Sequence, residues 1–464
     1  MKKIVFTAMI LFLAVMGIFA SNYSDIIKSA KENNISLKNA EISYLNSKLT
    51  IEKSELEDEV SITITGKAQV SPDLSITPTV TIVLPNDGST TISATTPFSM
   101  SYSDTSKLSF TPSISVSHTF DLSGYDSDII TALSNSKSAL QSEYSYQYSL
   151  LNFENSVISL MKSLINLEKN IENQKYSIQK SEKSLNDKLT LGQITTSSIT
   201  YNQLVNQLEL SKNTLSAYER QYENAKKQYK DLTGLEWEGV ENLPNPELSL
   251  ASLSTGNTNV IIKSIDVEIA KNNIEAKNAS INPKNVKVNG SVSGTGIKNE
   301  IASQKLLSAS AGATYSSGNW SLGTSLSTSY NLNNTSFDTP SVTISGSWSN
   351  KTAAKADELQ LKVLENNLIS ATNSFQDEYT SYLQSFNALQ LEVMQYEFSC
   401  SQTAANSDYL KANLENVRAY YEAGLATEQE LKDAEFNVKL DEYTQTVLVL
   451  DGLTLANKIK MLNL

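Results

Sequence analysis

The sequence has a single cysteine, a single histidine and no basic block. One cysteine cannot form a disulfide within the chain, and with one histidine it supplies too few ligands for a structural zinc site. We therefore expect no metal and no cofactor. No Ser/His/Asp set can be assembled, since His118 lies in an alternating Ser/Thr-rich run, so we expect no enzyme activity. The net charge of −13 argues against nucleic-acid binding.

Long hydrophobic runs are also missing, with one exception at the N-terminus. There Lys2 and Lys3 precede an apolar run of signal-peptide length, and Ala20 and Ser21 offer a cleavage site. We predict a signal peptide over residues 1–20, with an uncleaved anchor as the alternative. Nowhere else do about 18 apolar residues follow one another, as a spanning helix requires. Any membrane crossing by the mature chain must then be made by strands.

What is present is a repeated order of elements. The first repeat, 21–234, has a helical pattern over about 22–57, strands within about 58–121, a long helix over about 124–190 and a returning helix. A segment rich in Gly and Pro, 235–257, is typical of a linker. The second repeat, 258–464, has a helix over about 258–281, strands within about 284–349, a long helix over about 351–423 and a returning helix.

The strand regions alternate apolar residues with Ser and Thr, as in "SITITGKAQV" and "LSFTPSISVSHTF". This pattern predicts strands with one apolar and one polar face. An isolated hairpin is marginal in water, and strands that cross lipid need closed edges, so several copies sharing one barrel would satisfy both conditions. Aromatic residues near the strand ends suit the girdles of an outer-membrane barrel, although a sandwich core is the alternative. They are Phe98, Tyr102, Phe110, Phe120, Tyr315, Trp320, Tyr330 and Trp348.

The two long helices carry apolar residues seven apart, which indicates supercoiled packing. In the first they are Val157, Leu164, Ile171, Ile178 and Leu185; in the second they are Leu361, Leu368, Phe375, Tyr382, Leu389 and Tyr396. Cys400 lies on a helical stripe and is interpreted as a small core residue.

The breaks after the two long helices can be aligned. Gly192 matches Gly424, Thr195 matches Thr427, and Ile199 matches Leu431. We predict a left-handed cap at Gly192 and the N-cap of the returning helix at Thr195 or Thr196.

Two segments, "KLTLGQITTSSITYNQLVNQLELSKNTLSAYERQYENAKKQYKDLTG" and "YYEAGLATEQELKDAEFNVKLDEYTQTVLVLDGL", resemble the turn-and-return segment of TolC-family outer-membrane efflux proteins. The resemblance covers nearly the whole mature chain. It implies a fold that is mainly α with β: a homotrimeric outer-membrane β-barrel in contact with lipid, continued by a long periplasmic α-helical barrel, with two internal repeats per chain. It also implies docking on a periplasmic adaptor protein and an inner-membrane transporter or secretion ATPase.

The resemblance further implies a periplasmic gate. Glu430 and Asp433 stand where family members carry the carboxylates that line the constriction, so three copies would form two cation-selective rings with some raised pKa values. The alternative is attraction of carboxylates to a helix N-terminus, which accounts best for Glu428.

The helix-tip turns are the expected adaptor docking sites, and they include Gly192, Thr195, Ser198, Tyr421, Gly424, Ala426 and Thr427. Ala426 replaces the basic residue that often locks the closed tip in the family, and Ser198 replaces the corresponding acidic residue. The lock is therefore absent or rebuilt, for instance through Lys432.

These observations predict a passive export duct in the outer membrane, with a large periplasmic part. It would serve a tripartite efflux pump or a type I secretion system and be gated at its helix tips. The alternative is a structural periplasmic coiled-coil or surface protein with a β module and no pore.

Overall fold

The computed structural model describes residues 21–57, 61–69, 74–84, 90–100, 108–122, 125–126, 128–250, 257–281, 283–298, 303–349 and 354–464. The expected signal peptide and Tyr102 lie outside these ranges. The chain divides into two compact units. Unit 1 contains residues up to 44, 141–261 and 378–464, and unit 2 contains residues 45–140 and 262–377. Each unit draws on both sequence repeats.

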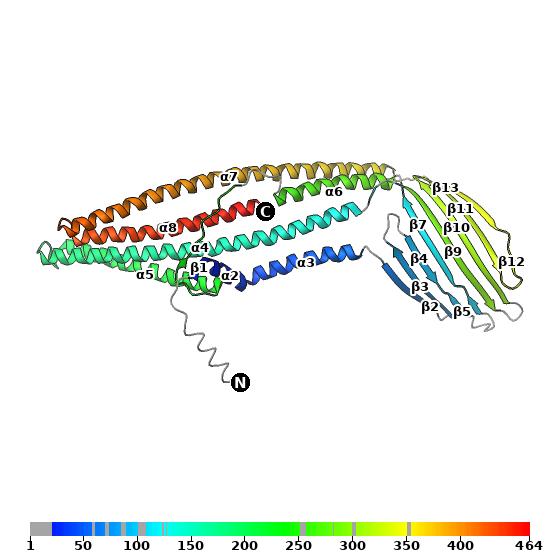
Figure 1. Ribbon diagram of the computed structural model, residues 1–464, viewed down its shortest axis with the longest axis horizontal. Helices are drawn as coiled ribbons and strands as arrows, with labels where there is room; N and C mark the ends of the chain where they lie inside the picture. The colour runs from blue at the N-terminus through cyan, green and yellow to red at the C-terminus, as the bar shows by residue number, and fades with distance from the viewer. Residues whose placement is uncertain are drawn as a thin grey trace, which may run out of the picture. The chain divides into compact units, whose positions relative to one another are not determined.

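Helices carry most of the chain (Figure 1). They are α2 (Tyr23–Asn33), α3 (Ile35–Glu57), α4 (Asp128–Thr190), α5 (Ile199–Thr233), α6 (Thr258–Ile281), α7 (Ala354–Glu422) and α8 (Glu428–Leu462). A two-stranded parallel sheet pairs β1 (Ser21–Asn22) with β8 (Val240–Glu241). Among the described residues, none of the helices has the length and hydropathy needed to cross a membrane.

The first helical region differs from expectation because it is two helices instead of one. The break is at Asn34, whose backbone is extended. Its side-chain oxygen accepts a hydrogen bond from the backbone N–H of Leu37 at 2.9 Å. This local bond satisfies one of the free donors at the start of α3, which favours the break over a continuous helix.

The core of unit 1 is where the long helices pack against α2. Ile26, Val157, Leu164, Tyr229 and Leu450 are fully buried there. The seven-residue seam is confirmed, because its members in both long helices are buried or half-buried. Segment 235–250 lies against this core and is more than a connection, since Trp237 is buried in it and donates a hydrogen bond to Glu168 at 2.6 Å.

Unit 2 contains one antiparallel sheet of eleven strand segments. They are β2 (Ser61–Gln69), β3 (Leu74–Leu84), β4 (Thr90–Thr95), β5 (Phe98–Met100), β6 (Leu108–Phe110), β7 (Ser113–Asp121), β9 (Lys284–Lys298), β10 (Ser303–Ser317), β11 (Trp320–Asn331), β12 (Ser336–Phe337) and β13 (Ser341–Trp348). Neighbouring strands lie side by side in chain order (Figure 1).

Three of the strand positions in the sheet are each occupied by two segments with a short interruption between them. β4 and β5 both pair with β3, β6 and β7 both pair with β9, and β12 and β13 both pair with β11. A proline lies in each interruption, at Pro97, Pro112 and Pro340, because proline cannot donate to the ladder. Merging these pairs reduces eleven segments to eight strand positions, four from each repeat. The strand over 90–100 was not identified from the alternation in the sequence.

The pairing register sorts side chains into rows that cross the whole sheet. One row contains only hydroxyl side chains: Thr63, Thr81, Ser93, Ser115, Ser291, Ser310, Ser327 and Ser341. The adjacent row, on the opposite face, contains only apolar residues and glycine: Ile62, Ile82, Ile92, Val116, Gly290, Ala311, Leu326 and Val342. Side chains alternate between faces along a strand, so the sheet has one hydroxyl face and one apolar face.

Candidate functional site

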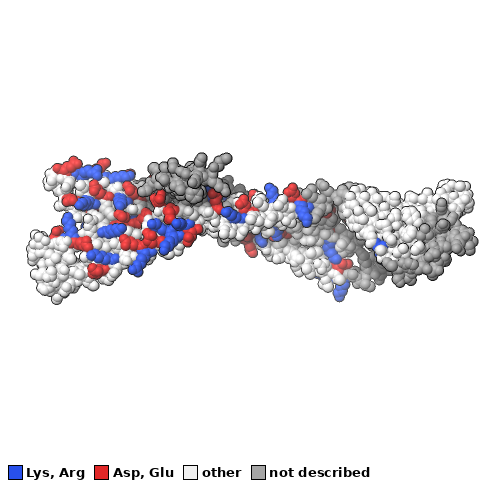
Figure 2. Space-filling view, turned by 90° about the horizontal axis from the view of Figure 1, so that it is seen from below, with Lys and Arg blue, Asp and Glu red and all other residues white. Residues whose placement is uncertain are grey.

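The apolar face of the sheet is uncovered. Large side chains along it are exposed, including Ile62 (64%), Trp320 (68%) and Ile344 (75%). The described part of the sheet shows almost no charge in Figure 2, while acidic and basic side chains are spread over the helices. An apolar surface of this extent, on which Lys284 lies only at the end of a strand, requires a non-aqueous or protein covering. The opposite face could line a water-filled space with neutral hydroxyl groups.

His118 lies on this apolar face. Its Nδ1 is 2.7 Å from the hydroxyl of Thr90, and its ring stands edge-on to Phe120 with 4.0 Å between ring centroids. Its Nδ1 is therefore satisfied within the sheet. Among the described residues, no cluster of three or more His, Cys, Asp or Glu is placed to hold a metal ion.

The two turns after the long helices have the same backbone geometry. Gly192 has a φ of 66° and Gly424 a φ of 73°, both in the left-handed region. In each turn the glycine N–H bonds to the carbonyl three residues earlier, and the next N–H bonds to the carbonyl five residues earlier. The Gln193 N–H reaches Lys188 at 2.9 Å, and the Leu425 N–H reaches Tyr420 at 2.7 Å. Matching hydrogen bonds support the alignment of the repeats at these turns.

The returning helices begin at different points, so the expected N-cap of the first is wrong. Ser198 caps α5 by accepting from the Tyr201 N–H, whereas Thr195 and Thr196 lie before the helix. The Thr195 carbonyl accepts the Ser198 N–H at 2.9 Å, which closes an extra turn before α5 can start. In the second repeat Thr427 is the N-cap, as its alignment with Thr195 would suggest.

The carboxylate of Glu430 belongs to the cap of α8. It accepts the Thr427 N–H at 2.6 Å and the Thr427 hydroxyl at 2.8 Å, while the Glu430 N–H donates to that hydroxyl. This reciprocal arrangement is a capping box. The backbone hydrogen bond from Thr427 lowers the pKa of Glu430.

The carboxylate of Asp433 joins the two repeats. It accepts the Tyr176 hydroxyl at 2.6 Å, the Lys180 ammonium at 3.0 Å and the Gln429 amide at 3.2 Å. The Tyr176 ring stacks on Phe436 with 4.0 Å between centroids. We call Tyr176, Lys180, Gln429, Asp433 and Phe436 the tip cluster, which connects α4 of the first repeat to α8 of the second.

Charge and burial act against each other in the tip cluster. Burial would raise the pKa of Asp433, but hydrogen bonds from Tyr176, Lys180 and Gln429 outweigh it and lower the pKa. Burial and the bond to Asp433 raise the pKa of Tyr176 to about 12. Within one chain Asp433 is therefore ionised and paired, the reverse of the raised pKa expected for crowded carboxylates.

Lys432, suggested from the sequence as a rebuilt lock, bonds within its own helix to Glu428 at 2.5 Å. Lys180 makes the connection between repeats instead. Ala426 carries no charge, and its N–H bonds to the Tyr420 carbonyl at 3.2 Å.

Tyr176 and Lys180 could not be identified as partners of Asp433 from the sequence, because they lie some 250 residues from it. Their spacing of four places them on one face of α4, but it does not indicate which residue they contact.

Further polar links connect α4 to α8 away from the tip cluster. Lys439 pairs with Glu172 at 2.7 Å, Lys169 donates to Thr444 at 2.8 Å, and Lys162 pairs with Asp451. Within the second repeat α7 meets α8 through Arg418 and Glu435 at 3.4 Å. The tip cluster is thus the last of several links between α4 and α8 before α8 begins at Glu428.

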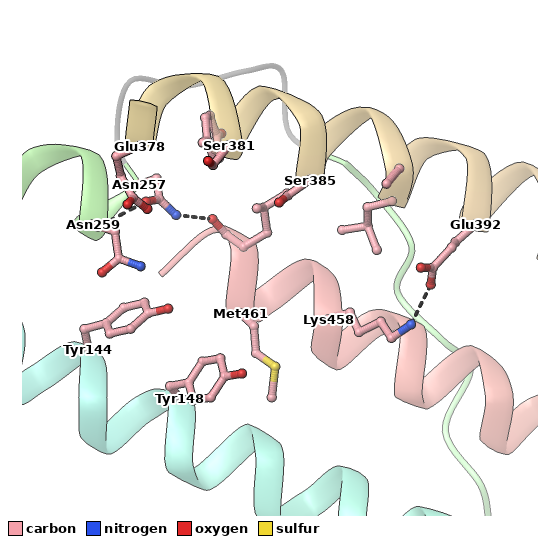
Figure 3. Close-up of a pocket in the computed structure, with 14 residues that line it drawn as sticks. Tyr144, Tyr148, Asn257, Asn259, Glu378, Ser381, Ser385, Glu392, Lys458 and Met461 are labelled. Carbon is pink, nitrogen blue, oxygen red and sulfur yellow. Dashed lines mark hydrogen bonds and ion pairs between the residues drawn. The ribbon is translucent and has the colours of Figure 1, made fainter. Parts of the chain in front are cut away.

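A pocket of about 460 Å³ lies in unit 1 between α4, α7 and the end of α8 (Figure 3). Tyr144 and Tyr148 of α4 face Met461 across it, and Lys458 closes one side through an ion pair with Glu392 at 2.6 Å. The pocket is open and mixed in polarity, and two of its charged side chains, Lys458 and Glu392, are paired with each other.

The comparisons with known proteins agree with this architecture. A family described as the TP096X N-terminal domain matches residues 26–256. No curated protein matches the sequence. The crystal structure of the outer membrane protein VceC from Vibrio cholerae superposes with a TM-score of 0.52 and 11% identity, over 95% of this chain and 96% of that chain. The chain has the fold of the TolC-family outer membrane factors.

Two other structures of this TolC-like fold give lower values. The Campylobacter jejuni CmeC outer membrane channel has a TM-score of 0.46 and 11% identity, over 95% of this chain and 86% of that chain. The open state of the Neisseria gonorrhoeae MtrE outer membrane channel has a TM-score of 0.43 and 15% identity, over 95% and 89%. The resemblance to the TolC family inferred from the sequence is confirmed at the level of fold by VceC.

Proposed function

We propose that the chain is a passive outer-membrane channel, and that its sheet crosses the membrane. The observation that carries this proposal is the two-faced sheet, with exposed large apolar side chains on seven of its eight described strand positions and hydroxyl groups behind them. Apolar-out and polar-in alternation is the arrangement that lets strands face lipid while lining an aqueous lumen. The TolC-like fold supports the same role.

The channel is proposed to be a homotrimer with a periplasmic helical duct. Single chains expose apolar stripes on their helices, as α3 does through Ile35, Ile42 and Leu49 and α7 does through Met394 and Phe398. Apolar stripes of this kind are stable when another protein surface, such as a second helix, covers them. Neighbouring copies would cover them.

The duct is proposed to close where α8 begins. The tip cluster holds α4 to α8, so separation of these helices requires the Asp433 bonds to break. Opening would then free Asp433, and three copies would present a ring of carboxylates able to bind cations. Glu430 stands one turn earlier in the same helix and would form a second ring, although its capping box restrains it.

A periplasmic adaptor is the proposed partner of the two turns, with an inner-membrane transporter or secretion ATPase beyond it. Leu191, Ile199 and Leu425 are 70–79% exposed at these turns. Exposed apolar residues on rigid, capped turns suit a protein interface. The chain has no energy source of its own in this proposal and acts as a duct, without enzyme activity.

Purified protein in planar bilayers tests the proposal. We expect detergent-extracted trimers that dissociate on heating and discrete single-channel conductance. Glu430→Gln combined with Asp433→Asn should weaken block by divalent and trivalent cations. A water-soluble monomer without conductance would instead support a structural periplasmic protein.

A further inference from the structure

The two outer edges of the sheet in unit 2 are β2 and β13. Among the described strands, β2 pairs only with β3 and β13 pairs only with β11. The two edges are nearly equal in length, at nine and eight residues. β2 carries one charged side chain, Lys67 on the hydroxyl face, and Pro340 lies just before β13. The other side chains of β2 and β13 are uncharged and neither strand contains a proline, so most of each edge is free of the features with which proteins block edge pairing.

The directions of these two strands are also compatible with pairing. They are the first and the last of eight antiparallel positions, so they run in opposite directions. β2 follows α3 and β13 leads into α7. When the β2 edge of one copy meets the β13 edge of the next, the pairing is antiparallel and every copy uses both edges. Such a head-to-tail contact forms a ring when the rotation between neighbouring copies closes, as a barrel requires.

We infer that β2 and β13 are the surfaces through which copies of this chain join, and that three copies build one barrel of 24 strands, eight from each chain. The trimer is taken from the proposed function. The face pattern continues across the joint, since Thr63 on β2 and Ser341 on β13 both belong to the hydroxyl row, and Ile62 and Val342 both belong to the apolar row.

Closure of a single chain on itself is the competing arrangement, and the side chains disfavour it. The interior of an eight-stranded barrel is just wide enough to be filled by side chains. Here the row that crosses the hydroxyl face from Thr63 to Ser341 consists of serine and threonine, which are too small to fill it, although longer side chains such as Lys67 and Lys287 also lie on this face. The sheet of one chain is also open, with β2 and β13 at its two ends.

The consequence is a wide lumen. With strands about 4.8 Å apart and tilted by roughly 40°, 24 strands enclose a backbone cylinder about 45–50 Å across. Its inner wall would be lined mainly by neutral hydroxyl groups. The barrel would therefore pass bulky hydrated cargo and select little by charge, which leaves selection to the helical duct.

Paired cysteines test the joint directly. In a Cys400→Ser background the chain has no other thiol. Cysteines are placed at Thr63, Thr65 or Lys67 together with Thr343, Ser345 or Ser347; all lie on the hydroxyl face, and three positions per edge allow for the stagger that a barrel requires. We expect oxidation to convert the monomer band on a denaturing gel into covalent dimers and trimers for at least one pair.

The matched control is Ser291→Cys with Ser310→Cys, whose hydroxyl oxygens are 2.7 Å apart on neighbouring strands of one chain. It should cross-link without changing the number of chains in the band. An intrachain β2–β13 cross-link, or no product from any pair while the control cross-links, would overturn the inference.

The unmodified trimer supplies a second measurement. Electron microscopy of the protein in detergent should resolve 24 strands around the barrel, and any other number contradicts the inference. A conducting trimer with a different strand number would leave the proposed function intact. If the protein neither conducts nor forms a trimer, both the proposed function and this inference are wrong.

Discussion

At the scale of single residues, Asp433 is the most connected acidic side chain of the candidate gate. Three donors from two helices converge on it, and one of them is a lysine of the other repeat. Each bond is modest, because exposed ion pairs contribute only about 0.2–1 kcal/mol. Their convergence at one point lets a small free-energy change release the start of α8 from α4, while the links farther along the two helices remain.

Removal of the lysine should weaken closure. We expect Lys180→Gln to raise the open-to-closed ratio about fivefold, as loss of about 1 kcal/mol implies. The measurement is open probability in planar bilayers. Lys212→Gln is the matched control: Lys212 pairs with Glu182 at the same 3.0 Å and similar exposure, but this pair joins α4 to α5 within one repeat. Equal effects of the two substitutions would contradict the gate.

Acid should act on the same contact. The pKa of Asp433 is lower in the folded protein than its ordinary value, so its bonds stabilise the closed tip at neutral pH and are lost as pH falls through the lowered pKa. We expect open probability to be steady from pH 7 to about 5 and to rise only below about pH 4. The pKa values of Glu428 and Glu430 are lowered too, so acid weakens the neighbouring contacts in the same direction.

Asp433→Asn separates these contributions. The variant keeps an acceptor for Tyr176 but has no titratable group, so the acid-dependent rise should shrink while the neutral-pH open probability increases. An unchanged acid response in this variant would assign the effect to Glu428 or Glu430.

At the scale of elements, the two turns show how similar sequences reach different helix starts. Both glycines adopt a positive φ, which costs a residue with a side chain about 1–2 kcal/mol. Beyond the glycine the repeats diverge, because Ser198 caps α5 three positions later than the aligned Thr427 would place it. Ser198 aligns with Glu430, so one position is a cap in one repeat and the partner of a cap in the other.

The caps predict stability changes of defined size. Ser198→Ala and Thr427→Ala should each lower the free energy of unfolding by about 1 kcal/mol, because a backbone N–H at the helix start loses its acceptor. Thr195→Ala should cost far less, since its hydroxyl reaches only the Ser197 hydroxyl at 3.2 Å. Denaturant midpoints of the three variants measure this. A large loss of unfolding free energy in Thr195→Ala would instead identify Thr195 as the N-cap of α5.

At the scale of the whole molecule, the sheet decides whether the chain inserts in a membrane. Leu326 lies on the apolar face with Ala311 and Val342 beside it, and Ser325 lies next to it on the hydroxyl face. If the apolar face meets lipid, Leu326→Lys should cost about 2–4 kcal/mol near mid-membrane and reduce the heat-modifiable trimer in membranes. Ser325→Lys, one residue away, should leave the trimer amount unchanged. Equal loss from both would point to a packed sandwich.

The sequence by itself determined the local architecture: alternating strands, helices with a seven-residue seam, and turns at Gly192 and Gly424. These depend on side chains within a few residues of one another, so their periodicity is visible along the chain. The cap of α5 is local too, but Thr195, Thr196 and Ser198 are all suitable cap residues, so the sequence did not choose among them. Only the tertiary structure decided which strands share one sheet and that Tyr176 and Lys180 hold Asp433. These contacts join residues far apart in the chain, and no local spacing encodes them.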